Sequence, residues 1–152
     1  MPNDAAERFA DSLADLLATW HLPRATGKVY AVLLLDEQAT TLQSLRERTG
    51  LSTGQVSTSI RELTSWGLAH TWTGEGTRRI YVEATSGLEV LLEASHRRAR
   101  LFIDALRAGE DLLSPASAAR ERLSDIVTLF DGYVDAGEQI LAGRRKSGAP
   151  SA

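Results

Sequence analysis

Apolar residues along this chain of 152 residues recur at spacings of three and four, a pattern that predicts helices with one buried face. The pattern first covers residues 5–20, where the apolar stripe consists of Ala6, Phe9, Leu13, Leu16 and Trp20. Pro23 ends that helix, because the residue before a proline avoids the helical conformation, and it suits the first turn of a second helix. The second helix should reach about residue 35, although its apolar run 29–35 would also fit a buried strand.

Two shorter helices follow, separated by a tight turn. Residues 42–49 form the first, and Gly50 can adopt the left-handed conformation that reverses the chain. Ser52 and Gln55 form a capping-box pattern that opens the second helix over residues 53–66. The sequence therefore predicts a helix-turn-helix at this point.

A small hairpin comes next, because two short strand-like runs follow the glycine that ends this helix. Residues 68–72 and 79–82 are predicted as the two strands, and Gly74 and Gly76 supply the loop between them. Helix, turn, helix and hairpin in this order indicate a winged helix-turn-helix, a fold that places one helix in the major groove of DNA.

The third part of the chain contains two longer helices. Ser86 and Glu89 make another capping box, which opens a helix that Gly109 should end; its stripe consists of Leu88, Leu92, Ser95, Ala99, Phe102 and Leu106. Ser114 and Pro115 suit the cap and first position of a helix reaching about residue 142, with the stripe Ala119, Leu123, Ile126, Phe130, Tyr133, Gly137 and Ile140. Residues 143–152 contain Gly, Ser and Pro and are predicted to be a disordered tail.

The helices at both ends must bury their apolar stripes, and a second copy of the chain offers the surface. The last helix, at 1.5 Å per residue, is roughly 40 Å long, which exceeds the needs of a small domain. We therefore expect a two-fold homodimer through these helices, with a monomeric helical subdomain as the alternative. The predicted fold is mainly α with a small β wing, in a single domain. Residues 22–84 form the winged helix-turn-helix module, and residues 5–20 and 86–142 form dimerisation helices.

The helix at 53–66 carries the chemistry that suits DNA. Val56, Ile60 and Leu63 should face the core, and the opposite side carries Thr53, Gln55, Ser57, Thr58, Arg61 and Glu62. Glutamine suits adenine, arginine suits guanine, and hydroxyl groups suit bases or phosphates. In the hairpin, Arg78 and Arg79 can reach a phosphate or the minor groove. Neighbours on a strand point to opposite faces, so we expect one arginine to contact DNA and the other to pair with an acid such as Glu62 or Glu75.

The net charge of −3 does not exclude a DNA partner, because the charge is unevenly distributed. Residues 42–82 hold five arginines and three glutamates, which gives +2 and leaves −5 for the rest of the chain. Arg97, Arg98 and Arg100 are expected on a solvated helix face. There is no cysteine, and the N-terminus lacks the apolar run of a secretory signal, so we expect a cytoplasmic protein that does not enter a membrane.

No catalytic or metal-binding pattern is visible. His21, His70 and His96 lie far apart without a second ligand at a metal spacing, and no glycine-rich phosphate loop precedes a helix. We expect neither an enzyme nor a bound metal or cofactor. Trp20, His21 and Tyr30 lie near the joint between the first two helices, where they could line a pocket that holds a cation against the rings. Ordinary core packing is the alternative explanation.

Three sequence segments resemble MarR-type transcriptional regulators, specifically their GbsR-like branch. They are LSTGQVSTSIREL at 51–63 with WGL at 66–68, RRIYV at 78–82 with ATSG at 84–87, and LPRATGKV at 22–29. The resemblance covers roughly residues 5–108. It implies a homodimeric bacterial transcription factor, usually a repressor, that binds a pseudo-palindromic operator and responds to a small molecule or chemical signal. Thr58 stands where many relatives carry a basic residue. This departure and the low positive charge favour the alternative, a winged-helix protein–protein interaction module without DNA binding.

Overall fold

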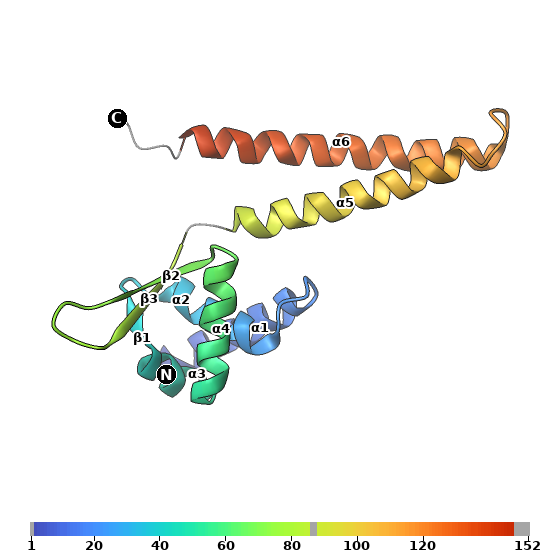
Figure 1. Ribbon diagram of the computed structural model, residues 1–152. Coiled ribbons are helices and arrows are strands. Elements are labelled where there is room, and N and C mark those ends of the chain that lie inside the picture. Colours follow the sequence, from blue (N-terminus) through green and yellow to red (C-terminus); the bar gives the residue numbers. More distant parts are fainter. Residues whose placement is uncertain (1, 86–87, 148–152) are drawn as a thin grey trace. The chain divides into compact units, whose positions relative to one another are not determined.

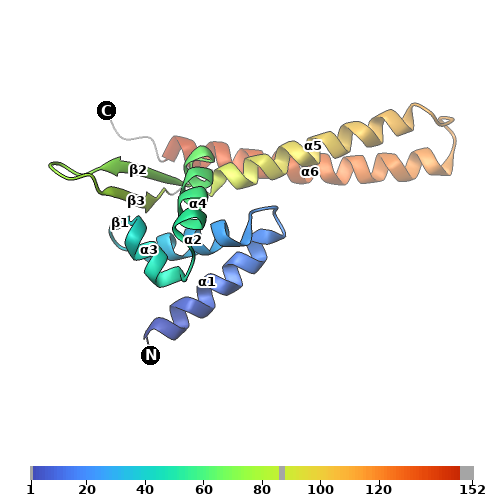
Figure 2. The ribbon, with the colours of Figure 1, turned by 60° about the horizontal axis from the view of Figure 1, so that its bottom comes forward.

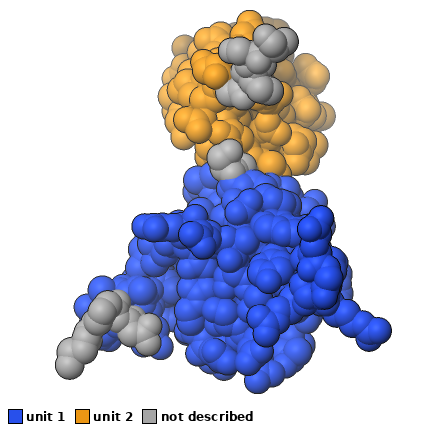
Figure 3. Space-filling model, turned by 90° about the vertical axis from the view of Figure 1, so that its left-hand side faces the viewer, with its two compact units in different colours: residues 1–88 blue, residues 89–152 orange. Residues whose placement is uncertain are grey.

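The computed structural model describes residues 2–85 and 88–147, and the chain divides between Leu88 and Glu89 into two compact units (Figure 3). The first unit contains helices α1 (Pro2–Ala18), α2 (Arg24–Leu35), α3 (Leu42–Thr49) and α4 (Thr53–Ser65), together with strands β1 (Thr40–Thr41), β2 (Ala69–Thr73) and β3 (Ile80–Ala84). The second unit contains α5 (Glu89–Glu110) and α6 (Ala118–Ser147) (Figure 1). Helix α1 thus packs in the first unit with the helix-turn-helix, and its main neighbour is α2.

Helices α1 and α2 pack closely because small residues meet at their contact. A Cβ atom added to Gly27 would lie 3.1 Å from the Cα of Ala14, and Ala10 and Ala14 are fully buried. The sequence therefore predicted the wrong face of α1 to be buried. Phe9 and Leu16 of the predicted stripe are exposed, while Ala10, Ala14 and Leu17 are buried. Small side chains allow the close approach, and the larger ones remain on the outside.

The helix-turn-helix has the local structure that its turn residues predict. Ser44 N donates to the Thr41 hydroxyl at the start of α3, and Gly50 ends α3 in the left-handed conformation at φ 71°. Helix α4 then packs mainly on α2 and α3 (Figure 2). The predicted bounds of both helices are confirmed to within one residue.

The three strands form an antiparallel sheet in the order β1-β3-β2. Thr40 pairs with Val82 from one side and Thr71 pairs with Val82 from the other, so β3 is the central strand. Strand β1 was not predicted, and β2 and β3 begin one residue later than predicted. The β2–β3 hairpin, called the wing below, extends beyond the helices of this unit in both ribbon views (Figures 1 and 2).

Helices α5 and α6 form an antiparallel hairpin with its own core. Ile103, Val127 and Val134 are buried at its centre, and Ala99, Leu106 and Phe130 pack against them. The predicted stripes are only partly correct, because Tyr133 is 74% exposed and Ile140 is 65% exposed. The stripe of α6 that meets α5 is displaced by one residue, to Val127, Val134 and Leu141.

The ends of these two helices differ from the sequence prediction. Gly109 lies inside α5, which continues to Glu110. Helix α6 begins at Ala118 instead of at Pro115, because the Ser117 hydroxyl accepts from Arg120 N at 3.0 Å and supplies the cap. Helix α6 also continues to Ser147, so the predicted disordered tail is wrong over residues 143–147. The capping residue proposed at Ser86 lies outside the described residues.

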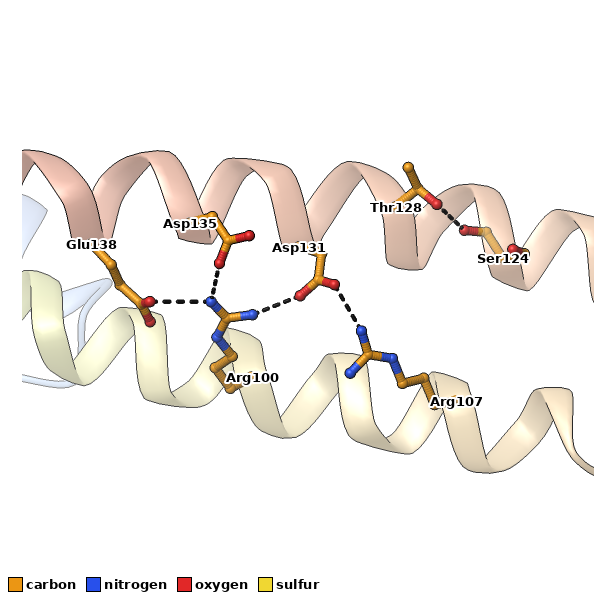
Figure 4. Close-up of polar contacts among 7 residues, drawn as sticks. All are labelled: Arg100, Arg107, Ser124, Thr128, Asp131, Asp135 and Glu138. Atoms are coloured by element: carbon orange, nitrogen blue, oxygen red, sulfur yellow. Dashed lines mark hydrogen bonds and ion pairs between the residues drawn. The ribbon is translucent and has the colours of Figure 1, made fainter.

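Ion pairs centred on Arg100 join the two helices of the hairpin (Figure 4). Its guanidinium donates to Asp131 and Asp135, each at 2.6 Å, and to Glu138 at 3.1 Å; Arg107 donates to the second oxygen of Asp131 at 2.7 Å. The hydrogen bonds to Asp135 and Glu138 raise the pKa of Arg100 above its usual value. The expectation of a solvated Arg100 is therefore wrong, and Arg97 and Arg98 are the exposed members of the group.

Candidate nucleic-acid interface

The start of α4 is fixed by a complete capping box. Gln55 N donates to the Ser52 hydroxyl at 3.1 Å, and Ser52 N donates to the Gln55 side-chain oxygen at 3.0 Å. These two bonds satisfy backbone donors that an uncapped helix start leaves free. The first turn of the candidate recognition helix is therefore held in one conformation.

Helix α4 separates its apolar and polar sides as predicted. Val56, Ile60 and Leu63 are buried against the first unit. Most of the predicted contact residues remain accessible on the other side: Thr53, Gln55, Thr58 and Arg61 are exposed, and Ser57 is half-buried. Glu62 departs from this group, because its carboxylate turns toward α2 and accepts a hydrogen bond from Thr26.

Arg46 of α3 belongs to the same surface, although sequence reasoning did not select it. Its guanidinium donates to the Thr53 hydroxyl at 2.9 Å, which brings an exposed positive charge to the start of α4. A shallow hollow of about 350 Å³ surrounds this contact, lined by Leu42, Gln43, Arg46, Thr53 and Val56. The signal in the sequence was the position of Arg46, four residues before the Gly50 turn, which points it toward the following helix.

The wing arginines lie just before β3 in the loop, both exposed. Arg79 N donates to the Thr77 hydroxyl, which fixes the loop locally. A second hollow of about 250 Å³ is lined by Thr41, Leu42, Gln43, Arg78, Arg79 and Ile80. Leu42 and Gln43 line both hollows, so one continuous surface runs from the start of α4 across α3 to the base of the wing. Among the described residues, no ion pair joins either arginine to Glu62 or Glu75, contrary to expectation.

Of the five arginines in residues 42–82, all of which the structure describes, Arg48 is the one that forms an ion pair with an acidic side chain. Its guanidinium donates to both oxygens of Asp36 at 2.7 Å, and also to the Thr40 hydroxyl at 3.1 Å. The hydrogen bond to Asp36 raises the pKa of Arg48 above its usual value. Arg48 thereby ties α3 to the end of α2, whereas Arg46, Arg61, Arg78 and Arg79 keep their charges accessible.

The predicted pocket near the first two helices is present in part. Trp20 and Tyr30 line a cavity of about 440 Å³ with apolar walls; its other lining residues are Leu13, Leu16, Leu17, Thr19, Leu34, Thr85 and Leu88. His21 does not line this cavity, and it has an exposed side chain and a positive φ of 67°. The structure therefore brings together two of the three predicted residues.

No group of three or more His, Asp or Glu side chains could hold a metal ion within residues 2–85 and 88–147. In the same ranges, every helix is too short or too polar to cross a membrane.

The fold of this chain is similar to that of solved protein structures. A crystal structure described as a transcriptional regulator superposes with a TM-score of 0.63 at 20% identity, over 93% of this chain and 99% of that chain. The chain has a winged helix-turn-helix fold.

Further solved structures are similar to this winged-helix chain at lower scores. S. aureus MepR bound to an oligodeoxyribonucleotide has a TM-score of 0.45 at 16% identity, over 88% of this chain and 93% of that chain. E. coli MarR complexed with operator DNA has a TM-score of 0.42 at 18% identity, over 62% of this chain and 66% of that chain. No protein-family model matches the chain, and no curated protein is significantly similar to it.

Proposed function

We propose that this protein is a DNA-binding transcriptional regulator of the MarR type, in the GbsR-like branch, and that it represses from the cytoplasm. The observation that carries the proposal is the continuous polar surface with four accessible arginines that spans α3, α4 and the wing. The winged-helix fold and the description of its similar structure as a transcriptional regulator support it. An enzymatic role has no comparable support.

In this proposal α4 enters the major groove. Thr53, Gln55, Ser57, Thr58 and Arg61 contact base edges or nearby phosphates, because they occupy its accessible side. Arg78 and Arg79 contact the backbone or the minor groove. Arg46 adds a phosphate contact at the start of α4, since its side chain already reaches Thr53.

The functional form in this proposal is a homodimer on a pseudo-palindromic operator. Each unit leaves large apolar side chains exposed, which water solvates poorly. They include Phe9, Leu16 and Trp20 in the first unit and Leu101, Phe102, Leu129, Tyr133 and Ile140 in the second. A two-fold partner would cover such surfaces and would set two copies of α4 about 34 Å apart, one turn of DNA.

The cavity beside Trp20 and Tyr30 is the proposed effector site. Its volume of about 440 Å³ suits a small molecule, and its walls are mainly leucine and aromatic carbon. An apolar or aromatic compound fits such walls, and a cationic group could lie against the Trp20 ring.

DNA binding is tested by selection from random duplexes, followed by titration of the recovered duplex at several salt concentrations. Affinity should fall steeply with salt, because each neutralised phosphate contributes roughly −0.9 to the log–log slope. The variant Arg61→Ala should weaken binding by about tenfold to a hundredfold, the value of one good base contact.

Arg8→Ala is the matched control for this experiment. Arg8 is an exposed arginine on α1 whose partner Asp4 is also exposed, and it lies outside the residues proposed to contact DNA. Its loss should leave affinity unchanged. Binding that is absent, or equally affected by both variants, would instead favour a protein–protein interaction module.

A further inference from the structure

A small polar cluster is buried between α2 and α4. Thr26 and Ser59 are each 1% exposed, and their hydroxyl oxygens lie 3.3 Å apart. The Thr26 hydroxyl donates to Glu62 Oε2 at 2.5 Å. Because Thr26 has a single hydroxyl proton and a carboxylate oxygen accepts, the hydroxyl donates that proton to the hydrogen bond with Glu62. The cluster therefore attaches the carboxylate of α4 to α2.

Glu62 needs this attachment because of its place on the helix. At 100° per residue, Glu62 lies about 40° from Thr58 and about 20° from Gln55 around the axis of α4. It stands at the edge of the side that is proposed to face DNA. An extended carboxylate at this position would lie near phosphate groups, whereas the observed carboxylate bends toward α2 and is half-buried.

We propose that Thr26 is a positioning residue for DNA binding, which holds the Glu62 carboxylate away from the phosphates. The inference rests on the proposed function. Thr26 lies on α2, outside the surface that would contact DNA, so its effect would be transmitted only through Glu62. When the Thr26 hydroxyl is removed, the half-buried carboxylate loses its donor and turns to solvent, where water solvates its charge.

The variant Thr26→Val tests this role, since valine resembles threonine in shape but lacks the hydroxyl. Affinity for the selected duplex should weaken by about fivefold at low salt, the usual size of one close like-charge contact between solvent-exposed groups. The defect should shrink as salt is added, because repulsion between solvent-exposed charges is screened. Thr26→Ser keeps the donor and should bind as the native chain does.

The double variant Thr26→Val/Glu62→Gln separates charge from helix orientation. If the freed negative charge causes the defect, the neutral amide restores affinity. If α4 has merely tilted, the double variant stays as weak as Thr26→Val, and the proposal is overturned.

A second pair of variants changes only Glu62 and leaves the buried Thr26 in place. Glu62→Asp keeps the negative charge, but its side chain is one methylene shorter and does not reach Thr26. Glu62→Gln removes the charge. The proposal requires weaker binding for the aspartate variant alone; equal affinities would overturn it. A native chain that fails to bind any duplex overturns the proposed function as well, whereas a native chain that binds while all these variants match it overturns this inference only.

Discussion

Gly137 shows how a single missing side chain shapes the second unit. A Cβ atom at this position would lie 2.6 Å from His96 Nε2 and 2.8 Å from its Cε1. The imidazole of α5 therefore lies directly on the backbone of α6, and the ring replaces the side chain that glycine lacks. The sequence prediction placed Gly137 in the apolar stripe but could not identify the partner, because His96 is 41 residues away and its own periodicity does not mark it as buried.

Gly137→Ala should accordingly stabilise the chain by less than the roughly 0.5–1 kcal/mol that alanine usually gains over glycine in a helix, because the tip of the half-buried His96 ring must move aside. The matched control is Gly132→Ala on the same helix, where an added Cβ meets no atom within 4 Å. That control should stabilise by about 0.5–1 kcal/mol, the helix preference of alanine over glycine. Thermal unfolding followed by circular dichroism measures both, and equal shifts for the two variants would contradict the observed contact.

Elements were predictable from sequence where their determinants are local. Gly50 and the Ser52–Gln55 pair act within one turn of the chain, and the bounds of α3 and α4 follow from them. The buried faces of α1 and α6 were not predictable, because each helix has two apolar stripes and periodicity does not say which one meets a neighbour. In α1 the close contact with Gly27 decides which stripe is buried, because alanine fits against that glycine and phenylalanine does not.

The residues of the candidate site likewise fall into those that local sequence predicts and those that depend on distant partners. Arg61 and Thr58 could be assigned from the polar side of their own helix, and both are exposed. The inward turn of Glu62 and the neutralisation of Arg48 depend on Thr26 and Asp36, which are distant in sequence. Long-range partners of this kind leave no periodic signal.

The α5–α6 hairpin should respond to acid through Glu89 at the start of α5. Hydrogen bonds from its own backbone N–H and from Arg144 lower the pKa of Glu89 below its usual value of 4.5. A carboxylate with a lowered folded-state pKa contributes stability above its unfolded pKa and loses it as the pH falls through the folded value. Glu89→Gln should thus lower Tm at pH 7, and the difference from the native chain should close below about pH 4.5.

Tm measured across pH 3 to 7 (roughly the range over which carboxylates titrate) checks this prediction. Asp125→Asn, an exposed carboxylate on α6, serves as control and should leave Tm nearly unchanged at every pH. A Glu89→Gln difference that persists undiminished at low pH would show that packing, and not the charge, is responsible.

At the scale of the whole molecule, apolar side chains remain uncovered in each unit. On α6, Leu129, Tyr133 and Ile140 form an exposed stripe beside the one that meets α5. A monomer would leave these side chains in water, whereas a dimer would bury them.

Ile140→Glu should therefore shift the protein from dimer to monomer, because a charge would be buried without a partner. Affinity for a two-fold duplex should fall by about a hundredfold or more as the second recognition helix is lost. Analytical ultracentrifugation gives the oligomeric state, with Gln139→Glu, an exposed position about 100° around α6 from Ile140, as the control. A native chain that sediments as a monomer at micromolar concentration would remove the basis of this prediction.

The capping box has a consequence for how base pairs are discriminated. The bond from Ser52 N occupies one of the two lone pairs of the Gln55 side-chain oxygen and orients that oxygen toward the helix start, so the NH₂ group is the part of the amide better placed to meet a base. Adenine presents a donor beside an acceptor in the major groove, so a glutamine oriented in this way is poorly placed to match it in a bidentate manner. Purine N7, guanine O6 and thymine O4 all satisfy a lone donor. Operators should therefore tolerate an exchange of adenine for guanine opposite Gln55. Arg61 should then be the residue that discriminates most strongly between bases.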